Sequence, residues 1–539
     1  MKKVHQRKRF ALIMAVVLCL GMLLGACSQQ APSSTPSSAP SSSAGSQPAG
    51  EADLTRTGGL ALPLVDEPTT ITWMVPSDVE NLNDLAVIQE ISRRTGITIE
   101  LMPYPKKSYA EKLNTMIGGG DLPDIVNGIL IADANAYGQM GAFADITDYV
   151  DELPNFKSLF VDDAENSWVL YSWASDDGSM YKWPIYGLAR DVNHGLLYRA
   201  DVFEELGIEP WTNTDEFYDA LAKVKEAYPD AYPFSSKNGA ALFKDLSKYW
   251  NVSDSRFPFY YDEADGRWKF TGASEGYKEM LDLLKKMYDN GLLDPEFLTD
   301  TQDTWSAKMT TDKSFVAWDW IGRMSLLKGQ VGDANPGFDL QFGRPVGEGK
   351  QHTLPKIDSF GPTVTKGENE LAALKLLDYL TSPEGSELFT VGIEGVNFEF
   401  DGNGTPVYPE LADEPLVDIN LLEEKYGMWI EGSYLRPDHR SVYYNYTEAE
   451  QAAQDLCNDV AGYNPNDPEL KLTDEETEAY ASIVVKVTQE IETFSSKYVT
   501  DASYGDAQWE AFAASAGEMG VSEALEILNA AQARFDESV

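Results

Sequence analysis

The sequence predicts an α/β protein with more than one domain. Its 539 residues are too many for a single hydrophobic core. Of these residues 43% are apolar and 24% are charged, a balance typical of a globular chain rather than a disordered or fibrous one. From about residue 69 onward, short apolar runs alternate with amphipathic stretches. This alternation favours parallel-type sheets flanked by helices.

The first elements follow that alternation. A buried strand is expected at 71–75, a helix at 82–94, a half-buried strand at 97–101 and a helix over 109–116. The apolar pair Ile125-Val126 follows a glycine break and predicts a third strand. Ligands of parallel sheets bind at the carboxyl ends of the strands, so we expect a site in the loops that follow these strands.

The same alternation returns later in the chain. We expect a strand at 195–198, a short helix at 201–206 and a helix over 276–288. Thr214 is predicted as the N-cap of another helix, and Ser382 as the cap of a helix that begins with a proline. The C-terminal third is helix-rich and acidic.

The N-terminus has the pattern of an export signal. Basic residues between 2 and 9 precede an apolar run over 10–24, which is too short for a comfortable membrane span. The run ends in Gly25-Ala26-Cys27 and resembles a bacterial lipobox. We therefore expect residues 1–26 to be a lipoprotein signal peptide and Cys27 to carry the lipid. An ordinary signal peptide with a chance cysteine is the alternative.

A low-complexity segment follows. Residues 28–50 contain no charged side chain and consist mostly of Ser, Pro, Ala, Gly and Gln. Such a composition cannot bury enough apolar surface to fold. Residues 27–68 are predicted to be a lipidated cysteine followed by a disordered Ser/Pro-rich tether.

Charge and cysteine content exclude several classes. The chain has 42 Lys and Arg against 87 Asp and Glu, a formal charge of -45. No nucleic-acid partner is expected, because such a chain repels a phosphate backbone, and the membrane is contacted only through the lipid anchor. Three cysteines, two of them in the N-terminal segment, do not supply a disulfide framework or a Cys-rich zinc site.

Four motifs occur in an order and spacing that resemble a known family. They are GGGDLPD at 118–124, GLLDPEF at 291–297, SFVAWDWIG at 314–322 and YLTSPEGSELFTVGIEG at 379–395. Together with the lipobox they resemble the family 1 extracellular solute-binding lipoproteins of Gram-positive bacteria. These are the substrate-capturing subunits of ABC importers, within the maltose-binding-like superfamily.

The resemblance implies a two-lobed periplasmic-binding-protein-like fold with a ligand cleft between the lobes. Lobe I would comprise 69–190 plus 345–400, and lobe II 191–344 plus 401–539. It further implies a monomer without cofactor, anchored by lipid on the extracellular face of the cytoplasmic membrane. By closing its cleft this protein would capture a small-molecule solute and deliver it unchanged to the permease subunits of an ABC transporter.

Aromatic residues indicate an oligosaccharide as the solute. The chain has 12 Trp and 27 Tyr, and sugar rings present C–H faces that pack on aromatic rings. Trp318 and Trp320 would share one face of a strand, with Arg323 on the following loop. Both tryptophans would face either the cleft or the core. A solvated arginine is the alternative for Arg323.

Further candidates for the ligand site come from the segment before the first crossing, from the loop after the glycine break, and from isolated tryptophans. Ordinary packing is the alternative for the aromatic residues, and a turn-stabilising role is the alternative for Asp124. The candidates are Trp183, Tyr186, Arg190, Asp121, Asp124, Trp250 and Trp429.

Other functions were considered alongside transport. A G-x-S-x-G pattern at 272–276 matches a serine nucleophile elbow, but Ser274 also stands where a helix N-cap is expected. A secreted glycoside hydrolase would need a carboxylate pair, which no motif identifies. A peptide-binding or sensory protein with the same fold is another alternative. No enzymatic activity is predicted.

One acidic turn is a weak calcium candidate. Asp262, Glu263 and Asp265 offer oxygen ligands beside Gly266, without the spacing of an EF-hand. A hairpin turn with Asp265-Gly266 at its tip is the alternative.

Overall fold

The computed structural model describes residues 54–188, 192–253, 255–347, 349, 351–352, 356–414, 416–457, 463–464 and 469–539. The predicted signal peptide, Cys27, most of the predicted tether and Arg190 lie outside these residues. In the part of the chain that is described, no helix has the length and apolar character needed to cross a bilayer.

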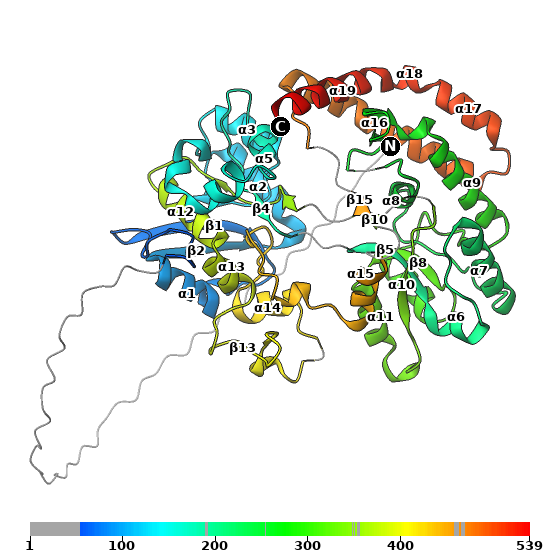
Figure 1. Ribbon diagram of the computed structural model, residues 1–539, viewed down its shortest axis with the longest axis horizontal. Coiled ribbons are helices and arrows are strands. Elements are labelled where there is room, and N and C mark those ends of the chain that lie inside the picture. Colours follow the sequence, from blue (N-terminus) through cyan, green and yellow to red (C-terminus); the bar gives the residue numbers. More distant parts are fainter. Residues whose placement is uncertain are drawn as a thin grey trace, which may run out of the picture. The chain divides into compact units, whose positions relative to one another are not determined.

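Most buried apolar side chains of the described residues fall into two hydrophobic cores, which define the two lobes (Figure 1). The core of lobe I draws on residues between 60 and 185 and between 357 and 435. The core of lobe II draws on residues between 196 and 346 and between 470 and 531. A smaller cluster around Leu197, Phe342 and Cys457 covers the other face of the lobe II sheet.

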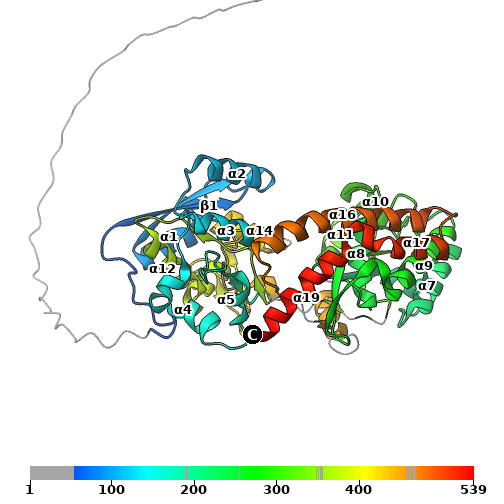
Figure 2. The same ribbon diagram turned by 90° about the horizontal axis from the view of Figure 1, so that it is seen from above.

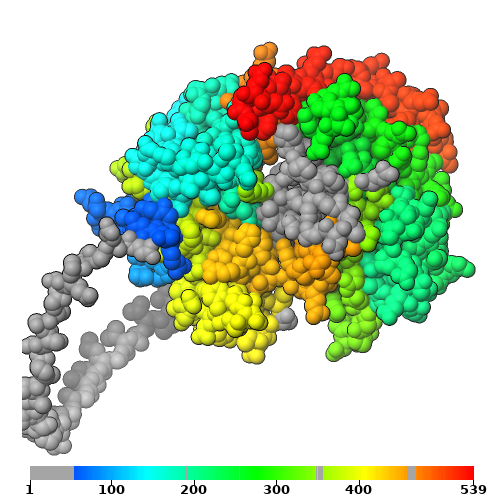
Figure 3. Space-filling model, viewed as in Figure 1, coloured from blue at the N-terminus to red at the C-terminus, as the bar shows by residue number. Residues whose placement is uncertain are grey.

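The core memberships differ from the prediction that residues 401–539 belong to lobe II. Leu422, Met428 and Ile430 are fully buried in the core of lobe I. In the space-filling view the yellow surface that this part of the chain contributes adjoins the blue N-terminal part of lobe I (Figure 3). The described chain therefore passes between the cores within 186–192, 346–357 and 436–452. The third crossing was predicted between residues 400 and 401 and lies later, because both lobes use the same kinds of apolar residue and periodicity does not mark the change of lobe.

Lobe I contains the predicted parallel sheet, in the order β12-β3-β1-β2. β1 pairs with β2 in parallel along its whole length, β3 joins it in parallel, and β12 adds an antiparallel edge. Five of the eight residues of β1 are buried, as expected for a strand covered on both faces. The strands of lobe I are β1 Thr69–Pro76, β2 Ile97–Tyr104, β3 Ile125–Val126, β4 Ile185–Tyr186, β11 Ile357–Asp358, β12 Thr363–Val364, β13 Glu399–Phe400 and β14 Pro406–Val407.

Helices pack on this sheet and beside it. The last turn of α1 carries Arg93 and Arg94, which suit its negative end, and Gly96 ends the helix in the left-handed conformation. The α-helices of lobe I are α1 Ala86–Thr95, α2 Tyr109–Gly119, α3 Ile131–Gln139, α4 Pro154–Phe156, α5 Trp168–Trp173, α12 Glu370–Thr381, α13 Pro383–Thr390 and α14 Ile419–Tyr426.

The sheet of lobe II is mixed rather than parallel. Its strands have the order β8-β5-β9, and both neighbours of β5 run antiparallel to it. Phe234 adds parallel bridges to Val316 and Leu293. The neighbours of β5 come from residues more than a hundred positions later, so local alternation of strands and helices did not determine their direction. The strands are β5 His194–Arg199, β6 Phe259–Asp262, β7 Arg267–Phe270, β8 Val316–Trp320, β9 Leu340–Gly343, β10 Gln351–His352 and β15 Tyr463–Asn464.

Long C-terminal helices complete lobe II, with α16 packed on α9 and α19 on β7 (Figure 2). The end of α19 also reaches lobe I, where the Phe535 ring meets Tyr171 of α5 edge-on with centroids 6.1 Å apart. The α-helices of lobe II are α6 Ala200–Leu206, α7 Thr214–Ala227, α8 Ala241–Ser247, α9 Glu275–Asp289, α10 Gln302–Thr310, α11 Arg323–Val331, α15 Glu448–Leu456, α16 Asp474–Thr500, α17 Asp506–Ala514, α18 Ala516–Met519 and α19 Val521–Ser538.

The predicted caps are confirmed at one helix and shifted at another. Ser382 caps α13 by accepting a hydrogen bond from the Gly385 amide. The cap of α7 is Asn213 instead of Thr214, because the Asn213 side chain accepts from the Glu216 amide. Thr214 is the first helical residue, and its hydroxyl donates to the Val346 carbonyl instead.

Candidate functional site

A pocket of about 490 Å³, here called the lobe I pocket, opens at the carboxyl ends of the parallel strands. Lys106 follows β2 into its wall, and Gly128 and Ile129 follow β3. Ser77, directly after β1, donates a hydrogen bond of 2.5 Å to Glu423, which also lines the pocket. The pocket therefore lies beside the loops in which the sequence predicts a site.

One wall of the lobe I pocket is the loop that follows α14. The buried side chain of Asn127 holds this loop by donating to the Glu431 carbonyl and to the Ser433 hydroxyl, both at 2.9 Å. Its carbonyl oxygen in turn accepts from the Trp73 indole. Trp429 has a positive φ of 56°, a strained conformation for a large side chain that persists only where the surroundings hold it. The loop is thus fixed in place before any ligand binds.

The lining next to this loop presents apolar surface to solvent. Phe360 and Leu130 line the pocket with exposed fractions of 40% and 71%. The Asp358 carboxylate accepts from the Phe360 amide at 2.7 Å and so fixes the turn that carries the ring. An exposed ring beside a carboxylate is suited to a ligand that has both an apolar face and hydrogen-bond donors.

Charged groups meet at the inner wall. The Glu423 carboxylate is buried and receives the Lys106 ammonium at 3.2 Å as well as the Ser77 hydroxyl. Lys106 lies 3.7 Å from the Glu431 carboxylate on the rim. These ion pairs neutralise Lys106 and leave the pocket lining with more negative than positive charge.

A buried lysine supports the pocket floor. Lys182 has no exposed surface, and its ammonium donates to the Ile129 carbonyl at 2.5 Å. Burial lowers the pKa of Lys182 to about 7, and the negative charge of Asp358 partly opposes this shift. This side chain fixes the loop after β3, which carries Gly128, Ile129 and Leu130 into the lining.

Two predicted aromatic residues lie at or beside this pocket. Trp429 lines it, although its ring is almost fully buried and its indole donates to the Thr390 carbonyl at 2.8 Å. Tyr186 is half-buried next to Ile185, a lining residue, and the Lys356 ammonium lies 5.3 Å from its ring centroid.

Three other predicted residues of lobe I lie away from the pocket. Trp183 is a core residue with no exposed surface, and its indole donates to Thr381. Asp124 precedes β3 at its amino end, where its carboxylate accepts from the Thr72 amide and hydroxyl. Asp121 is exposed three residues before it. Asp124 thus joins β1 and the start of α12 to the loop before β3 instead of holding its own turn, and it lies at the opposite end of the strands from the lobe I pocket.

The predicted residues of lobe II gather around the end of β8. Trp320 is 40% exposed, and its ring lies over Gly322 so closely that a Cβ atom there would be 2.4 Å from the ring. Trp318 is half-buried against the core and stacks on His194, with centroids 5.2 Å apart. Burial lowers the pKa of His194 to about 4, so the imidazole is neutral at physiological pH.

Arg323 and Trp250 are engaged within lobe II. Arg323 donates to the buried Asp319 carboxylate at 3.1 Å, and the Lys237 ammonium lies 3.2 Å from the same carboxylate. Its guanidinium lies 5.7 Å from the Trp305 ring centroid. Trp250 is half-buried against the core of lobe II. Trp320 is therefore the residue of this group that offers an aromatic surface to solvent.

The weak calcium candidate is a hairpin turn, as in the alternative interpretation. Asp262 and Asp265 both pair with the Lys269 ammonium, at 2.6 Å in the case of Asp262. This hydrogen bond lowers the pKa of the Asp262 carboxyl. Gly266 has a φ of 63° at the tip between β6 and β7. A lysine ammonium therefore occupies the position where a cation would bind, and Glu263 is exposed beside it.

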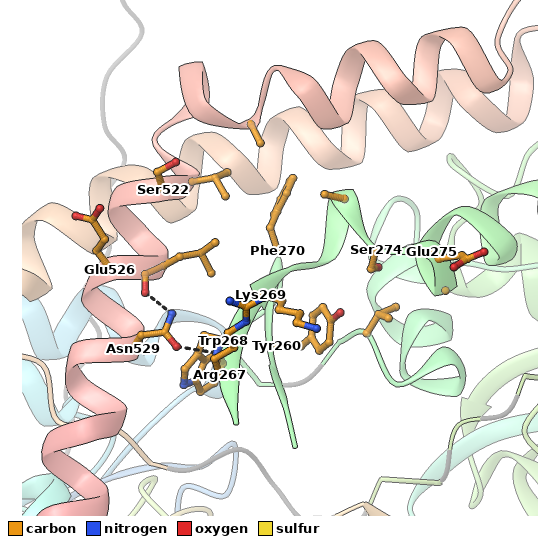
Figure 4. Close-up of a pocket in the computed structure, with 16 residues that line it drawn as sticks. Tyr260, Arg267, Trp268, Lys269, Phe270, Ser274, Glu275, Ser522, Glu526 and Asn529 are labelled. Carbon is orange, nitrogen blue, oxygen red and sulfur yellow. Dashed lines mark hydrogen bonds between the residues drawn. The ribbon is translucent and has the colours of Figure 1, made fainter. Parts of the chain in front are cut away.

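Lobe II has a larger hollow of about 940 Å³, here called the lobe II hollow, between the β6–β7 hairpin, the start of α9 and helix α19 (Figure 4). Its polar groups serve the fold. The Asn529 side chain accepts from the Trp268 amide at 2.9 Å and donates to the Leu525 carbonyl at 2.7 Å. Ser274 caps α9 by accepting from the Tyr277 amide at 3.3 Å, which confirms the capping interpretation of the G-x-S-x-G pattern. The smaller lobe I pocket is therefore the candidate functional site.

Comparison with known proteins agrees with this architecture. Residues 86–394 match the model of the bacterial extracellular solute-binding protein family. The chain belongs to this family. It is thus related to solute-binding proteins, and its sequence identity to the relatives described next is low.

Two relatives illustrate the distance. The chain is 26% identical over 302 residues to the fructooligosaccharide ABC transporter substrate-binding protein FusA of Streptococcus pneumoniae, covering 52% of this chain and 54% of that protein. It is 22% identical over 353 residues to the polygalacturonan/rhamnogalacturonan-binding protein YtcQ of Bacillus subtilis, covering 62% of this chain and 67% of the relative. The chain therefore spans only about half the length of FusA.

Solved structures show the same two-lobed fold. The alginate-binding protein AlgQ2 superposes with a TM-score of 0.69 at 24% identity, covering 87% of this chain and 99% of that one. FusA in complex with kestose gives 0.66 at 20% identity, again over 87% of this chain and 99% of the other. At these identities the likeness establishes the fold of this solute-binding protein.

Several lining residues of this solute-binding protein were not identified from its sequence. The expected loop after the strand at 97–101 contains Lys106, so its position was indicated although its role was not. Nothing local marks Glu423, Glu431 or Phe360, which reach the pocket from more than 230 residues further along the chain. An aromatic residue two positions after an aspartate, at the end of the short strand β11, is the one weak signal for Phe360.

Proposed function

We propose that this protein captures an oligosaccharide outside the cell and delivers it to the permease of an ABC importer. The observation that carries the proposal is the lobe I pocket itself. At the carboxyl ends of parallel strands it combines an exposed aromatic ring, Phe360, with the carboxylates Asp358, Glu423 and Glu431. A sugar ring offers a C–H face to the aromatic ring and hydroxyl donors to the carboxylates.

The relatives support a sugar as the ligand class. Their names specify fructooligosaccharide in one case and polygalacturonan or rhamnogalacturonan in another. We infer that Trp320 of lobe II supplies a second aromatic surface, which closes on the ligand held by lobe I as the lobes move together. Closure requires no bond to be broken, and the closed form is the one that a permease would recognise.

A binding screen tests the proposal. The mature protein is titrated by calorimetry and by thermal shift with neutral and acidic oligosaccharides and with peptides of similar length. A ligand at 100 times its dissociation constant stabilises the folded state by about 2.7 kcal/mol. Stabilisation by peptides alone would contradict the proposal, and so would release of shortened products from a bound oligosaccharide.

A pair of variants localises the site. Phe360→Ala removes the exposed ring of the pocket and should weaken sugar binding about tenfold, since stacking of this kind is worth about 1 kcal/mol or more. Val407→Ala, on the β13–β14 hairpin outside the pocket, is the matched control because its side chain is 47% exposed. Equal affinities of the two variants would exclude Phe360 from the site.

We propose further that Cys27 carries a lipid that holds the protein at the outer face of the cytoplasmic membrane. The sequence Leu24-Gly25-Ala26-Cys27 after an apolar run supports this. In the native host, metabolic labelling with palmitate should mark the wild-type protein and not Cys27→Ser, which should accumulate unprocessed. Labelling that persists in the variant would contradict the proposed anchor.

A further inference from the structure

We propose that the lobe I pocket selects uncharged oligosaccharides and discriminates against anionic sugars such as oligouronates. This inference rests on the proposed function and specifies its ligand class. It rests on the charged side chains around the pocket, all of which belong to described residues.

The pocket lining is anionic. Three carboxylates line it, those of Asp358, Glu423 and Glu431, whereas Lys106 is the one basic side chain among the described lining residues. Lys106 lies 3.2 Å from Glu423 and 3.7 Å from Glu431. A sugar carboxylate would have to displace one of these partners to reach the ammonium. It would also face the remaining carboxylates at short range, where like charges repel most strongly.

The same carboxylates suit hydroxyl groups. An ionised carboxylate has about four acceptor positions, and a hydrogen bond from a neutral donor to a charged acceptor is stronger than one between neutral groups. Asp358 uses one oxygen for the Phe360 amide, directly beside the exposed ring. A neutral sugar stacked on Phe360 therefore has charged acceptors next to its ring edge.

Three described cations near the two half-sites are already engaged, whereas Lys356 beside Tyr186 is 46% exposed, with its ammonium 3.7 Å from the Glu165 carboxylate. Lys182 lies beneath the pocket with no exposed surface and donates to the Ile129 carbonyl. In lobe II, Lys237 and Arg323 share the Asp319 carboxylate at 3.2 and 3.1 Å. Closure of lobe II at Trp320 would therefore bring neutralised cations toward the ligand rather than a site for its carboxylates.

The long-range field has the same sign. With a formal charge of -45 the protein repels a polyanion before contact, and this contribution falls as salt screens it. The local ion pairs are screened less, because Glu423 is buried. Discrimination should hence weaken with salt and still persist at high salt.

The test compares two ligands of equal length, an inulin-type fructooligosaccharide and an oligogalacturonate, by calorimetry at about 50 mM and about 500 mM sodium chloride. We expect the neutral ligand to bind at least about tenfold more tightly at low salt, with a smaller ratio at high salt. Glu431→Gln keeps the shape and removes one rim charge, so it should improve oligogalacturonate binding several-fold relative to wild type.

Glu424→Gln is the matched control, because it removes the same charge from α14 beside Glu423 at a side chain that is 60% exposed and does not line the pocket. The ratio of its affinities for the two ligands should remain that of the wild type. Equal or tighter binding of the oligogalacturonate at both salt concentrations would overturn the inference and leave the proposed function intact. Failure of both ligands, with binding of peptides, would overturn the proposed function as well.

Discussion

The lobe I pocket and the lobe II hollow are both lined by aromatic and charged side chains, yet their polar groups are used differently. In the lobe II hollow, Asn529 and Ser274 hold the hairpin and the start of α9 together. In the lobe I pocket, Asn127 and Lys182 lie behind the surface and hold loops whose own side chains face outward. The hollow has nearly twice the volume, about 940 against about 490 Å³. Volume alone therefore does not identify a binding site, whereas the position at the strand ends and the support from behind do.

Filling each cavity gives the strongest test of this comparison. Ser359→Trp introduces a large ring at an exposed position in the lobe I pocket and should reduce oligosaccharide affinity by about 100-fold. Ser522→Trp does the same in the lobe II hollow and should leave the affinity unchanged. Calorimetry on both variants measures this, and a loss of affinity in Ser522→Trp would move the site to the hollow.

Removing the supporting amides should separate stability from binding. Asn127→Leu leaves the Trp73 indole and the Glu431 carbonyl without their partner and should cost about 2 to 4 kcal/mol of unfolding free energy. It should also weaken ligand binding, because the loop that carries Glu431 is no longer held.

Asn529→Leu is the corresponding change in the lobe II hollow. It removes the partner of the Trp268 amide and should cost about 1 to 3 kcal/mol with no change in affinity. Urea unfolding and calorimetry measure the two quantities. If both variants lose stability and neither loses affinity, the support of the pocket by Asn127 has no role in binding.

The smallest expected effect is that of a single pH unit. Because the pKa of Lys182 falls to about 7 in the folded state, from an ordinary value near 10.5, the unfolded chain binds more protons between these values. Compared with a neutral side chain at this position, Lys182 therefore destabilises the folded state most below pH 7. The free energy of unfolding rises as the pH increases above 7. Lys182→Met should remove this contribution, at most about 1.4 kcal/mol per pH unit.

Unfolding curves from pH 6 to 9 for wild type and Lys182→Met would show the difference shrinking as the pH rises. A constant difference would mean that Lys182 keeps its ordinary pKa when the protein is folded. Asp358 faces the same ammonium with the opposite charge, so Asp358→Asn should lower the pKa of Lys182 further.

Much of lobe I followed from local sequence. The run at 71–75 is a mostly buried strand, the alternating stretch at 97–101 is a half-buried strand parallel to it, and the helix that ends before Gly96 lies between them. Such patterns are set by residues close together in the sequence. Apolar side chains that repeat every 3.6 residues mark the buried face of a helix, and those that repeat every second residue mark the buried face of a strand. For the same reason, the sequence predicted a site in the loops that follow those strands.

Tertiary structure alone decided the rest. Glu423 and Glu431 lie more than 300 residues from Lys106 and meet it only because the chain returns to lobe I after 346–357 and stays in that core until residue 435. Trp183 and Trp320 were both candidates for the ligand site, and packing made one a core residue and left the other exposed. Side-chain type and spacing fix what an element can bury. Which distant segments supply the facing surface depends on long-range contacts, and these determine both the charge of the pocket and the residues that can touch a ligand.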